Sequence, residues 1–171
     1  DLYQFHNHPN FIHPGDGTGL YEAALKAKES GKIRHIGITN HRQHIAKQAV
    51  ESGLYETLQF PFSYLASESD IEIVKACKDA GMGFIPMKAL SGGLITSSAA
   101  AYAYMAQYDN VVPIWGIQRE SELDEFLAYN DNPPALTGEL KSVIDKDNTE
   151  LSGDFCRGCG YRMPCPTGIE I

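Results

Sequence analysis

The sequence has few cationic residues and no long apolar run. Its 171 residues include 14 Lys and Arg against 22 Asp and Glu, which gives a formal net charge of −8 at pH 7. This acidic balance argues against a nucleic-acid partner, because phosphates need clustered Lys and Arg, although it leaves room for a local anion site. No stretch is long and apolar enough to span a bilayer, so we expect no membrane partner.

Cysteine is also scarce, and it is unevenly distributed. Three of the four cysteines, Cys156, Cys159 and Cys165, crowd one terminus, whereas Cys77 lies in a segment of helical periodicity and is predicted to be a buried structural thiol. A disulfide framework would spread its cysteines through the chain, so the cluster favours a metal or redox role and a reducing, cytoplasmic setting. No signal peptide is visible, and the chain starts with Asp1 inside a strand-like run. We therefore expect a piece of a longer protein.

Apolar runs of strand length alternate with segments of helical periodicity. We expect strands at 1–6, 33–39, 57–62, 84–90 and 111–116, and helices at 18–32, 41–53, 67–83, 98–108 and 120–130. Strands separated by helices of this length predict parallel pairing. An open doubly wound sheet and a (β/α)₈ barrel both have this order of elements.

The loops that follow the strands separate these two architectures. An open nucleotide-binding sheet usually carries Gly-x-Gly-x-x-Gly after its first strand, but here HNHPN follows. Polar residues instead follow every strand, which is typical of a barrel whose site collects at the C-terminal strand ends: His6, Asn40, Gln59, Lys88, Arg119. We predict an α/β fold, a partial TIM barrel of about five βα units over 1–131, followed by a helical connector and a small cysteine-containing module over 132–171.

Five segments resemble the aldo/keto reductase family. DLYQFHNHP, GKIRHIGITNH, TLQFPFSYL, GMGFIPMKALSGGL and VVPIWGIQRESELDEF are similar, in this order, to the fourth to eighth strands of its (β/α)₈ barrel. A subgroup of the family ends in a ferredoxin-like tail, and CRGCGYRMPCP is similar to it.

The resemblance implies an oxidoreductase that transfers hydride between NADPH or NADH and a small carbonyl substrate. In the family a tyrosine acid, a lysine and an aspartate lie on the first three strands, which this chain lacks. Only the histidine that orients the substrate has a counterpart here, His6, where a neutral imidazole can polarise a carbonyl oxygen. We therefore expect this chain to be inactive by itself.

Uncharged hydrogen-bonding side chains end two neighbouring strands. Thr39, Asn40 and Gln59 offer the donors and acceptors that a nicotinamide carboxamide needs, and the family holds that amide at these positions. A purely structural alternative stays open for Asn40, because an asparagine that opens a helix can also cap it.

Two later segments are candidates for the remainder of the cofactor. The resemblance places Met87 where the family stacks a tyrosine on the nicotinamide, while Lys88, Ser91 and Gly92 are candidates for the pyrophosphate. A plain turn explains the glycines equally well.

Gly116 and Arg119 precede the last expected helix of the barrel and can hold the ribose phosphate of the adenosine. Glu122 stands where many family members have a basic residue. The choice between NADP and NAD therefore stays open.

The tail has one departure from the ferredoxin-like spacing. Arg162 occupies the position of the third cysteine, so only Cys156, Cys159 and Cys165 are available as thiolate ligands. Three thiolates can hold a 4Fe-4S cluster with one open iron, a three-iron cluster or a zinc ion, and they can also hold no metal. An electron-transfer partner would accompany a cluster.

Two other classes of function are considered. A non-catalytic half-barrel would bind a nucleotide or associate with another copy through its open edges. A metal-dependent hydrolase would use His6 and His8, with His13 nearby, but no carboxylate follows the later strands to complete its ligand set.

Overall fold

The computed structural model describes residues 1–151, which divide into two compact units. The first unit consists of Asp1–Pro61, Ser67–Met87 and Asn110–Val112. The second contains Phe62–Ala66, Lys88–Asp109 and residues 113–151.

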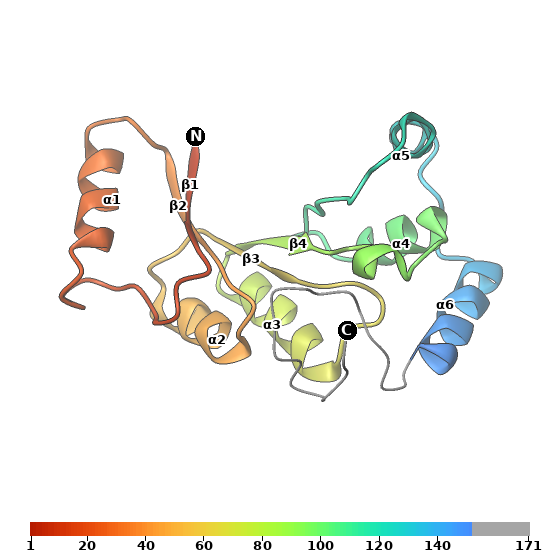
Figure 1. Ribbon diagram of the computed structural model, residues 1–171, viewed down its shortest axis with the longest axis horizontal. Coiled ribbons are helices and arrows are strands. Elements are labelled where there is room, and N and C mark those ends of the chain that lie inside the picture. Colours follow the sequence, from red (N-terminus) through yellow and green to blue (C-terminus); the bar gives the residue numbers. More distant parts are fainter. Residues whose placement is uncertain (152–171) are drawn as a thin grey trace, which may run out of the picture. The chain divides into compact units, whose positions relative to one another are not determined.

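The first unit is built on a parallel sheet (Figure 1). Its four strands follow the order β1-β2-β3-β4 and are Leu2–His6 (β1), His35–Thr39 (β2), Thr57–Pro61 (β3) and Gly83–Met87 (β4). Each strand pairs with the next one along the chain, and all of the pairings are parallel. The predicted parallel arrangement is confirmed.

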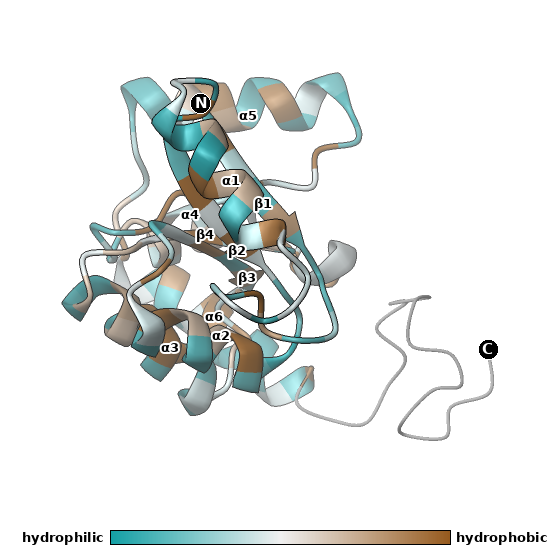
Figure 2. Cartoon of the chain, turned by 90° about the vertical axis from the view of Figure 1, so that its left-hand side faces the viewer, coloured by the Kyte–Doolittle hydropathy of each residue, from teal (hydrophilic) through white to brown (hydrophobic). Residues whose placement is uncertain are grey.

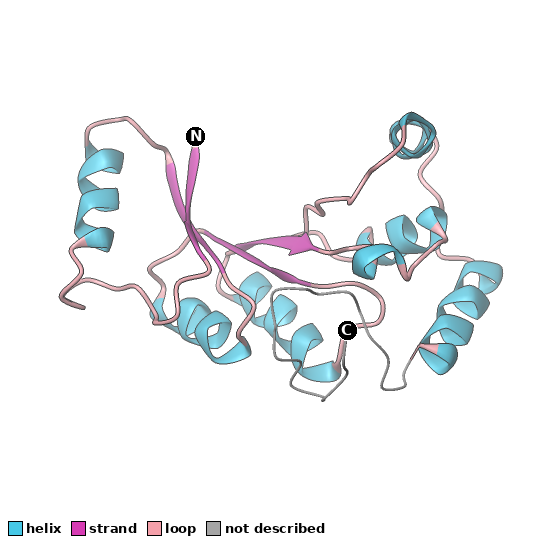
Figure 3. Ribbon diagram, viewed as in Figure 1, coloured by secondary structure: helices cyan, strands magenta, loops and turns pink. Residues whose placement is uncertain are grey.

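Three helices connect these strands: α1 (Leu20–Glu29), α2 (Gln43–Ser52) and α3 (Glu68–Asp79) (Figure 3). The start of α3 follows from its sequence, because Ser67 accepts from the Asp70 N–H while the Asp70 carboxylate accepts from the Ser67 N–H. Gly53 ends α2 with a φ of 64°, which glycine adopts without steric penalty. Both α2 and α3 carry hydrophobic and hydrophilic residues (Figure 2), and their buried residues are Ile45, Ala46 and Ala49 in α2 and Ile73, Val74 and Cys77 in α3.

The two faces of the sheet differ in burial. Ile36, Ile38 and Leu58 belong to the face that is fully covered, together with Phe84. The alternate residues, which lie on the other face, include the half-buried Gln59. The strands approach closely on that second face.

A single glycine permits this approach. A Cβ atom at Gly37 would lie 2.1 Å from Oγ1 of Thr57 and 3.2 Å from Cγ of Gln4, so only glycine fits between these two neighbours. Gly37 therefore leaves room for the side chains of Gln4 and Thr57 on the face that carries the predicted site residues.

The predicted fifth strand, 111–116, is wrong. Val111 forms only an isolated parallel bridge with Phe84, supported by a 2.9 Å hydrogen bond from the Val112 N–H to the Phe84 carbonyl oxygen. The next hydrogen bond of the ladder would run from the N–H of residue 86 to the Val112 carbonyl oxygen, but residue 86 is a proline without an N–H, so the pairing stops there. The described residues therefore contain four strands of a barrel rather than five βα units.

The second unit is helical, with α4 (Ser98–Met105), α5 (Glu120–Asp131) and α6 (Gly138–Glu150) preceded by the 3₁₀ turn η1 (Ser91–Gly93). Its core contains the buried residues Tyr64, Ile95, Ala100, Ala101 and Ile144. Helix α5 joins α4 through aromatic contacts, because Phe126 stacks on Trp115 at 4.6 Å and Trp115 stacks on Tyr102 at 6.3 Å.

None of the helices formed by residues 1–151 combines the length and the apolarity needed to cross a bilayer.

Candidate functional site

Three predicted site residues form one row across the sheet of the first unit. His6 at the end of β1 pairs with Thr39 of β2, and Thr39 pairs with Gln59 of β3. Because register partners in a parallel sheet project to the same face, the three side chains belong to one surface at the C-terminal strand ends. The side chain of His6 is exposed there, which leaves its imidazole accessible.

The centre of this row contains a hydroxyl without a partner. Thr39 is only 4% exposed, and its Oγ1 makes no hydrogen bond to any described residue. Folding removes this hydroxyl from water without replacing the hydrogen bond, which is unfavourable unless another group satisfies it. The row therefore has an unused polar atom beside the exposed His6.

Asn40 is held firmly by its surroundings. The residue is fully buried; its Nδ2 donates to the His8 carbonyl oxygen at 2.9 Å, and its Oδ1 accepts from the N–H groups of His41 at 2.9 Å and Arg42 at 3.0 Å. This amide thus joins the loop after β1 to the loop after β2 and caps the approach to α2. One Nδ2 hydrogen remains for any further contact.

Gln59 contacts a second predicted residue. Its Nε2 lies 3.8 Å from Sδ of Met87 at the end of β4, a distance at which a thioether acts as a weak acceptor. Both residues are half-buried and lie on the face that carries Thr39. Met87 therefore limits the orientations of the Gln59 amide.

The long loop after β1 is anchored at its centre. Ile12 is fully buried, and its carbonyl oxygen accepts a 2.5 Å hydrogen bond from the hydroxyl of Tyr55. Burial raises the pKa of Tyr55, so this hydroxyl stays a donor. The anchor fixes the loop that follows His6.

Sequence reasoning missed two residues of this region, Asn7 and Arg42. Asn7 has a left-handed φ of 45°, its N–H donates to the Thr39 carbonyl oxygen at 2.7 Å, and its Oδ1 lies 3.5 Å from Nη1 of Arg42. The only sequence signal was position, since each lies close to a residue already singled out.

The second unit contains the other predicted cofactor contacts, in two separate segments. Lys88, Ser91 and Gly92 belong to one turn, in which Lys88 and Ser91 adopt φ values of 58° and 50° and Gly92 one of 69°. The Ser91 N–H donates to the Lys88 carbonyl oxygen at 2.7 Å, and the Ser91 hydroxyl lies 2.8 Å from that of the buried Ser63. The turn is thus held by its own hydrogen bonds.

The start of α5 already holds an anion. Oε2 of Glu122 accepts from the N–H groups of Gln118 at 2.8 Å and Arg119 at 3.2 Å, and these hydrogen bonds lower the pKa of Glu122. Gly116 and Arg119 are both exposed, and a Cβ at Gly116 would meet nothing within 4 Å. The backbone donors predicted for a ribose phosphate are therefore occupied by a carboxylate of the chain itself.

The strand-end row and the parallel sheet agree with the result of sequence comparison. The model of the aldo/keto reductase family matches residues 1–99. The chain belongs to this family. The predicted family membership is thus confirmed, and it places the chain among the oxidoreductases of aldo/keto reductase type.

Two comparisons place this aldo/keto reductase chain among its relatives. It is 32% identical over 106 residues to the uncharacterized oxidoreductase YrpG of Bacillus subtilis, a match that covers 58% of this chain and 31% of that protein. The holo form of the aldo-keto reductase AKR11C1 from Bacillus halodurans has a similar fold, with a TM-score of 0.68 at 19% identity over 86% of this chain and 60% of that one. Its apo form gives the same TM-score.

These matches confirm the predicted fold class, an α/β fold that corresponds to part of a TIM barrel. The chain spans about a third of the length of the Bacillus subtilis relative and about 60% of that of the solved reductase.

The cysteine stretch lies beyond these findings. Cys156, Cys159, Cys165 and Arg162 lie outside the described residues, and the family match ends at residue 99. Cys77, in contrast, is buried as predicted, and burial raises the pKa of its thiol to about 12.

The hydrolase alternative finds no support in the aldo/keto reductase chain. Within residues 1–151, no three His, Cys, Asp or Glu side chains gather into a metal-binding group. Nδ1 of His8 lies 2.9 Å from the Asn10 carbonyl oxygen, and that of His13 lies 3.0 Å from the Pro14 carbonyl oxygen. These histidines are occupied in local loop contacts.

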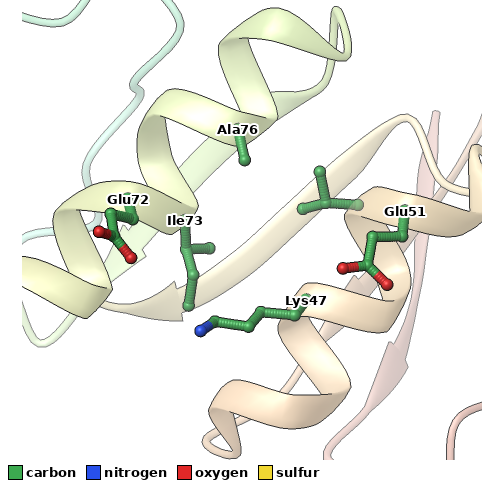
Figure 4. Close-up of a pocket in the computed structure, with 6 residues that line it drawn as sticks. Lys47, Glu51, Glu72, Ile73 and Ala76 are labelled. Atoms are coloured by element: carbon green, nitrogen blue, oxygen red, sulfur yellow. The ribbon is translucent and has the colours of Figure 1, made fainter.

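A small groove lies between α2 and α3, with a volume of about 170 Å³ (Figure 4). Its lining comes only from these helices and consists of Lys47, Val50, Glu51, Glu72, Ile73 and Ala76. No residue of the strand-end row lines this groove, so it is separate from the candidate site.

Proposed function

We propose that this chain supplies the substrate-orienting histidine and the nicotinamide-binding edge of an NAD(P)H-dependent carbonyl reductase. The observation that carries the proposal is the buried, unpartnered Oγ1 of Thr39, which lies between His6 and Gln59 in the strand-end row. A hydroxyl of this kind fits a hydrogen bond to the carboxamide of a nicotinamide.

The strand-end residues would contact different parts of the nicotinamide. Thr39 and Gln59 would hold the amide, and Asn40 would add its remaining Nδ2 hydrogen. Met87 would cover the ring beside them with a polarizable thioether. When bound, the cofactor supplies the hydride that reduces the carbonyl.

His6 acts on the substrate. Its neutral imidazole donates an N–H to the carbonyl oxygen, which polarises the carbonyl and stabilises the negative charge that grows on this oxygen. The exposed position of His6 leaves this nitrogen open to substrate. His6 does not supply the proton in this scheme, because the family assigns that step to its tyrosine.

The proposal predicts binding without turnover. NADPH or NADH fluorescence should change on titration with this chain, and absence of binding at millimolar cofactor would contradict the proposed cofactor site.

A carbonyl compound added with NADPH should not be reduced, because the Asp, Tyr and Lys positions of the family have no counterpart in this chain. Steady cofactor oxidation would contradict this assignment of the catalytic residues.

A second candidate function is association through an open sheet edge. Within the described residues β1 pairs only with β2, and its Leu2 and Tyr3 are 39% and 45% exposed. Unpaired strand edges with apolar side chains favour pairing with another chain. Light scattering after size-exclusion chromatography tests this, since a strictly monomeric chain at high concentration would contradict it.

For the tail we propose an iron–sulfur site coupled to the reductase, supported by the spacing of Cys156, Cys159 and Cys165. Purification without oxygen, followed by assays for iron, acid-labile sulfide and zinc, separates the three outcomes. Iron with sulfide supports the cluster, and zinc alone supports a tetrahedral zinc site. A colourless, metal-free protein would contradict both kinds of metal site.

A further inference from the structure

We propose that Arg42 binds a carboxylate group of the substrate beside His6, so that the substrate is an oxo acid rather than a neutral carbonyl compound. This inference rests on the proposed function, because it adds a substrate class to the carbonyl reductase described above. It follows from the position, the charge and the free donors of one guanidinium group.

The position of Arg42 is defined by two loops. Arg42 is the residue that precedes α2, with a non-helical φ of −100° and ψ of 120°, and its Nη1 lies 3.5 Å from Oδ1 of Asn7. Asn7 follows His6 directly, and its N–H bonds to the Thr39 carbonyl oxygen at 2.7 Å. The guanidinium is thus held at the residue next to the substrate-orienting histidine.

The charge of Arg42 is not neutralised by the described part of the chain. Ion pairs between described residues engage Lys28, Arg34, His35, Arg119 and Lys146, and none of them involves Arg42. The first turn of α2 has no acidic residue.

The acid at the start of the adjacent helix is engaged elsewhere. Asp70 of α3 accepts from Nε2 of Gln43 at 2.7 Å and from the Ser67 hydroxyl at 2.8 Å. Within the described residues an exposed cation therefore remains available at the start of α2, after the C-terminal end of β2.

The guanidinium group of Arg42 favours a carboxylate as its ligand. A guanidinium carries five N–H donors in a planar fork, and the contact with Asn7 is a long one that uses a single nitrogen. Two parallel N–H donors match the two oxygens of a carboxylate in a charge-assisted pair, whereas an ester offers only a weaker neutral acceptor and a hydrocarbon group offers none. A carboxylate on Arg42 would fix the orientation of the carbonyl that His6 polarises.

The test compares a ligand that carries a carboxylate with its neutral methyl ester, which differs from it by the charge and one methyl group. The full chain is titrated with 4-formylbenzoate and with its methyl ester by calorimetry, and ¹H–¹⁵N spectra follow the amides of Asn7 and Arg42. We expect the acid to bind about tenfold more tightly than the ester, as one charged hydrogen-bonded contact provides. Added salt should reduce this preference.

Three variants test whether Arg42 causes the preference for the acid over the ester. Arg42→Gln should bind the acid and the ester equally, and Arg42→Lys should recover part of the preference. Arg34→Gln is the matched control. Arg34 precedes the N-terminal end of β2, whereas Arg42 follows its C-terminal end, and Arg34 pairs with Asp1. This control should keep the full preference, and circular dichroism verifies that each variant is folded.

The outcomes separate the inference from the proposed function. Equal binding of acid and ester to the unmodified chain, or an unchanged preference in Arg42→Gln, overturns the carboxylate subsite. Loss of NADPH binding in Arg42→Gln also overturns it, since the arginine would then contact cofactor phosphate. If NADPH binds no variant while the acid preference still depends on Arg42, the subsite stands and the proposed function fails.

Discussion

The side chain of Asn40 donates to the carbonyl oxygen of His8 at 2.9 Å and so ties together the loops that follow β1 and β2. The same amide accepts from two backbone N–H groups with its oxygen. A residue predicted for cofactor binding is therefore also a structural connection, and the remaining capacity of its amide is a single N–H.

Asn40→Ala should destabilise the chain by about 2 to 4 kcal/mol, because it removes a fully buried side chain that bonds to backbone groups of His8, His41 and Arg42. Urea unfolding measures the loss. Asn10→Ala, at an exposed position of the loop after β1, is the control and should unfold at the urea concentration of the unmodified chain. Equal stability of Asn40→Ala would contradict the structural role of the amide.

Thr39→Val should separate stability from cofactor binding. Removing the unpartnered hydroxyl should leave the free energy of unfolding unchanged or raise it by about 1 kcal/mol, while cofactor affinity should fall about fivefold. Thr57→Val is the matched control, since Oγ1 of Thr57 is also buried without a partner but lies earlier on β3 than Gln59, outside the strand-end row. The control should gain stability and keep its affinity, and parallel losses in both variants would argue against a cofactor contact at Thr39.

Glu122→Gln should shift the cofactor preference. The Glu122 carboxylate occupies the N–H groups of Gln118 and Arg119 and repels a ribose phosphate, so its neutralisation should improve NADPH binding relative to NADH by about two- to fivefold. Fluorescence titration with both cofactors measures the ratio. Glu120→Gln, two residues earlier in the same turn, should leave the ratio unchanged. A ratio that does not respond to Glu122→Gln would place the phosphate elsewhere.

Acid sensitivity should depend on Glu56. Partial burial raises the pKa of this carboxyl, but hydrogen bonds from Lys28, His35 and the Ile36 N–H outweigh burial and lower it to about 2. A pKa below the unfolded value of 4.5 means that the stabilisation is complete above about pH 4.5 and is lost as the pH falls toward 2.

Glu56→Gln should therefore lower stability near neutral pH by about 1 kcal/mol, a small value because the carboxyl is partly exposed and screened. The difference from the unmodified chain should vanish near pH 2, as urea unfolding over the pH range would show. Glu51→Gln, at an exposed position of α2, is the control and should match the unmodified chain throughout. A deficit for Glu56→Gln that persists at pH 2 would contradict the ionic origin of the effect.

The sequence by itself determined the order of the elements, the parallel pairing and the residues that end the strands, because these follow from local periodicity, turn residues and the spacing of apolar runs. His6, Thr39 and Gln59 could be predicted as neighbours since each lies in the C-terminal part of its expected strand or in the middle of a short one. The family followed from the same segments.

Tertiary structure decided what local patterns do not contain. The ladder at Val111 stops because Pro86 of β4 has no N–H to donate to the Val112 carbonyl oxygen, although the apolar run continues beyond Val112. The donors before α5 are taken by Glu122, and the hydroxyl of Thr39 is left unsatisfied. Arg42 became a candidate only when its contact with Asn7, 35 residues away in the sequence, placed its guanidinium at the residue that follows His6. Such pairings depend on the path of the folded chain, which brings distant residues within hydrogen-bonding distance.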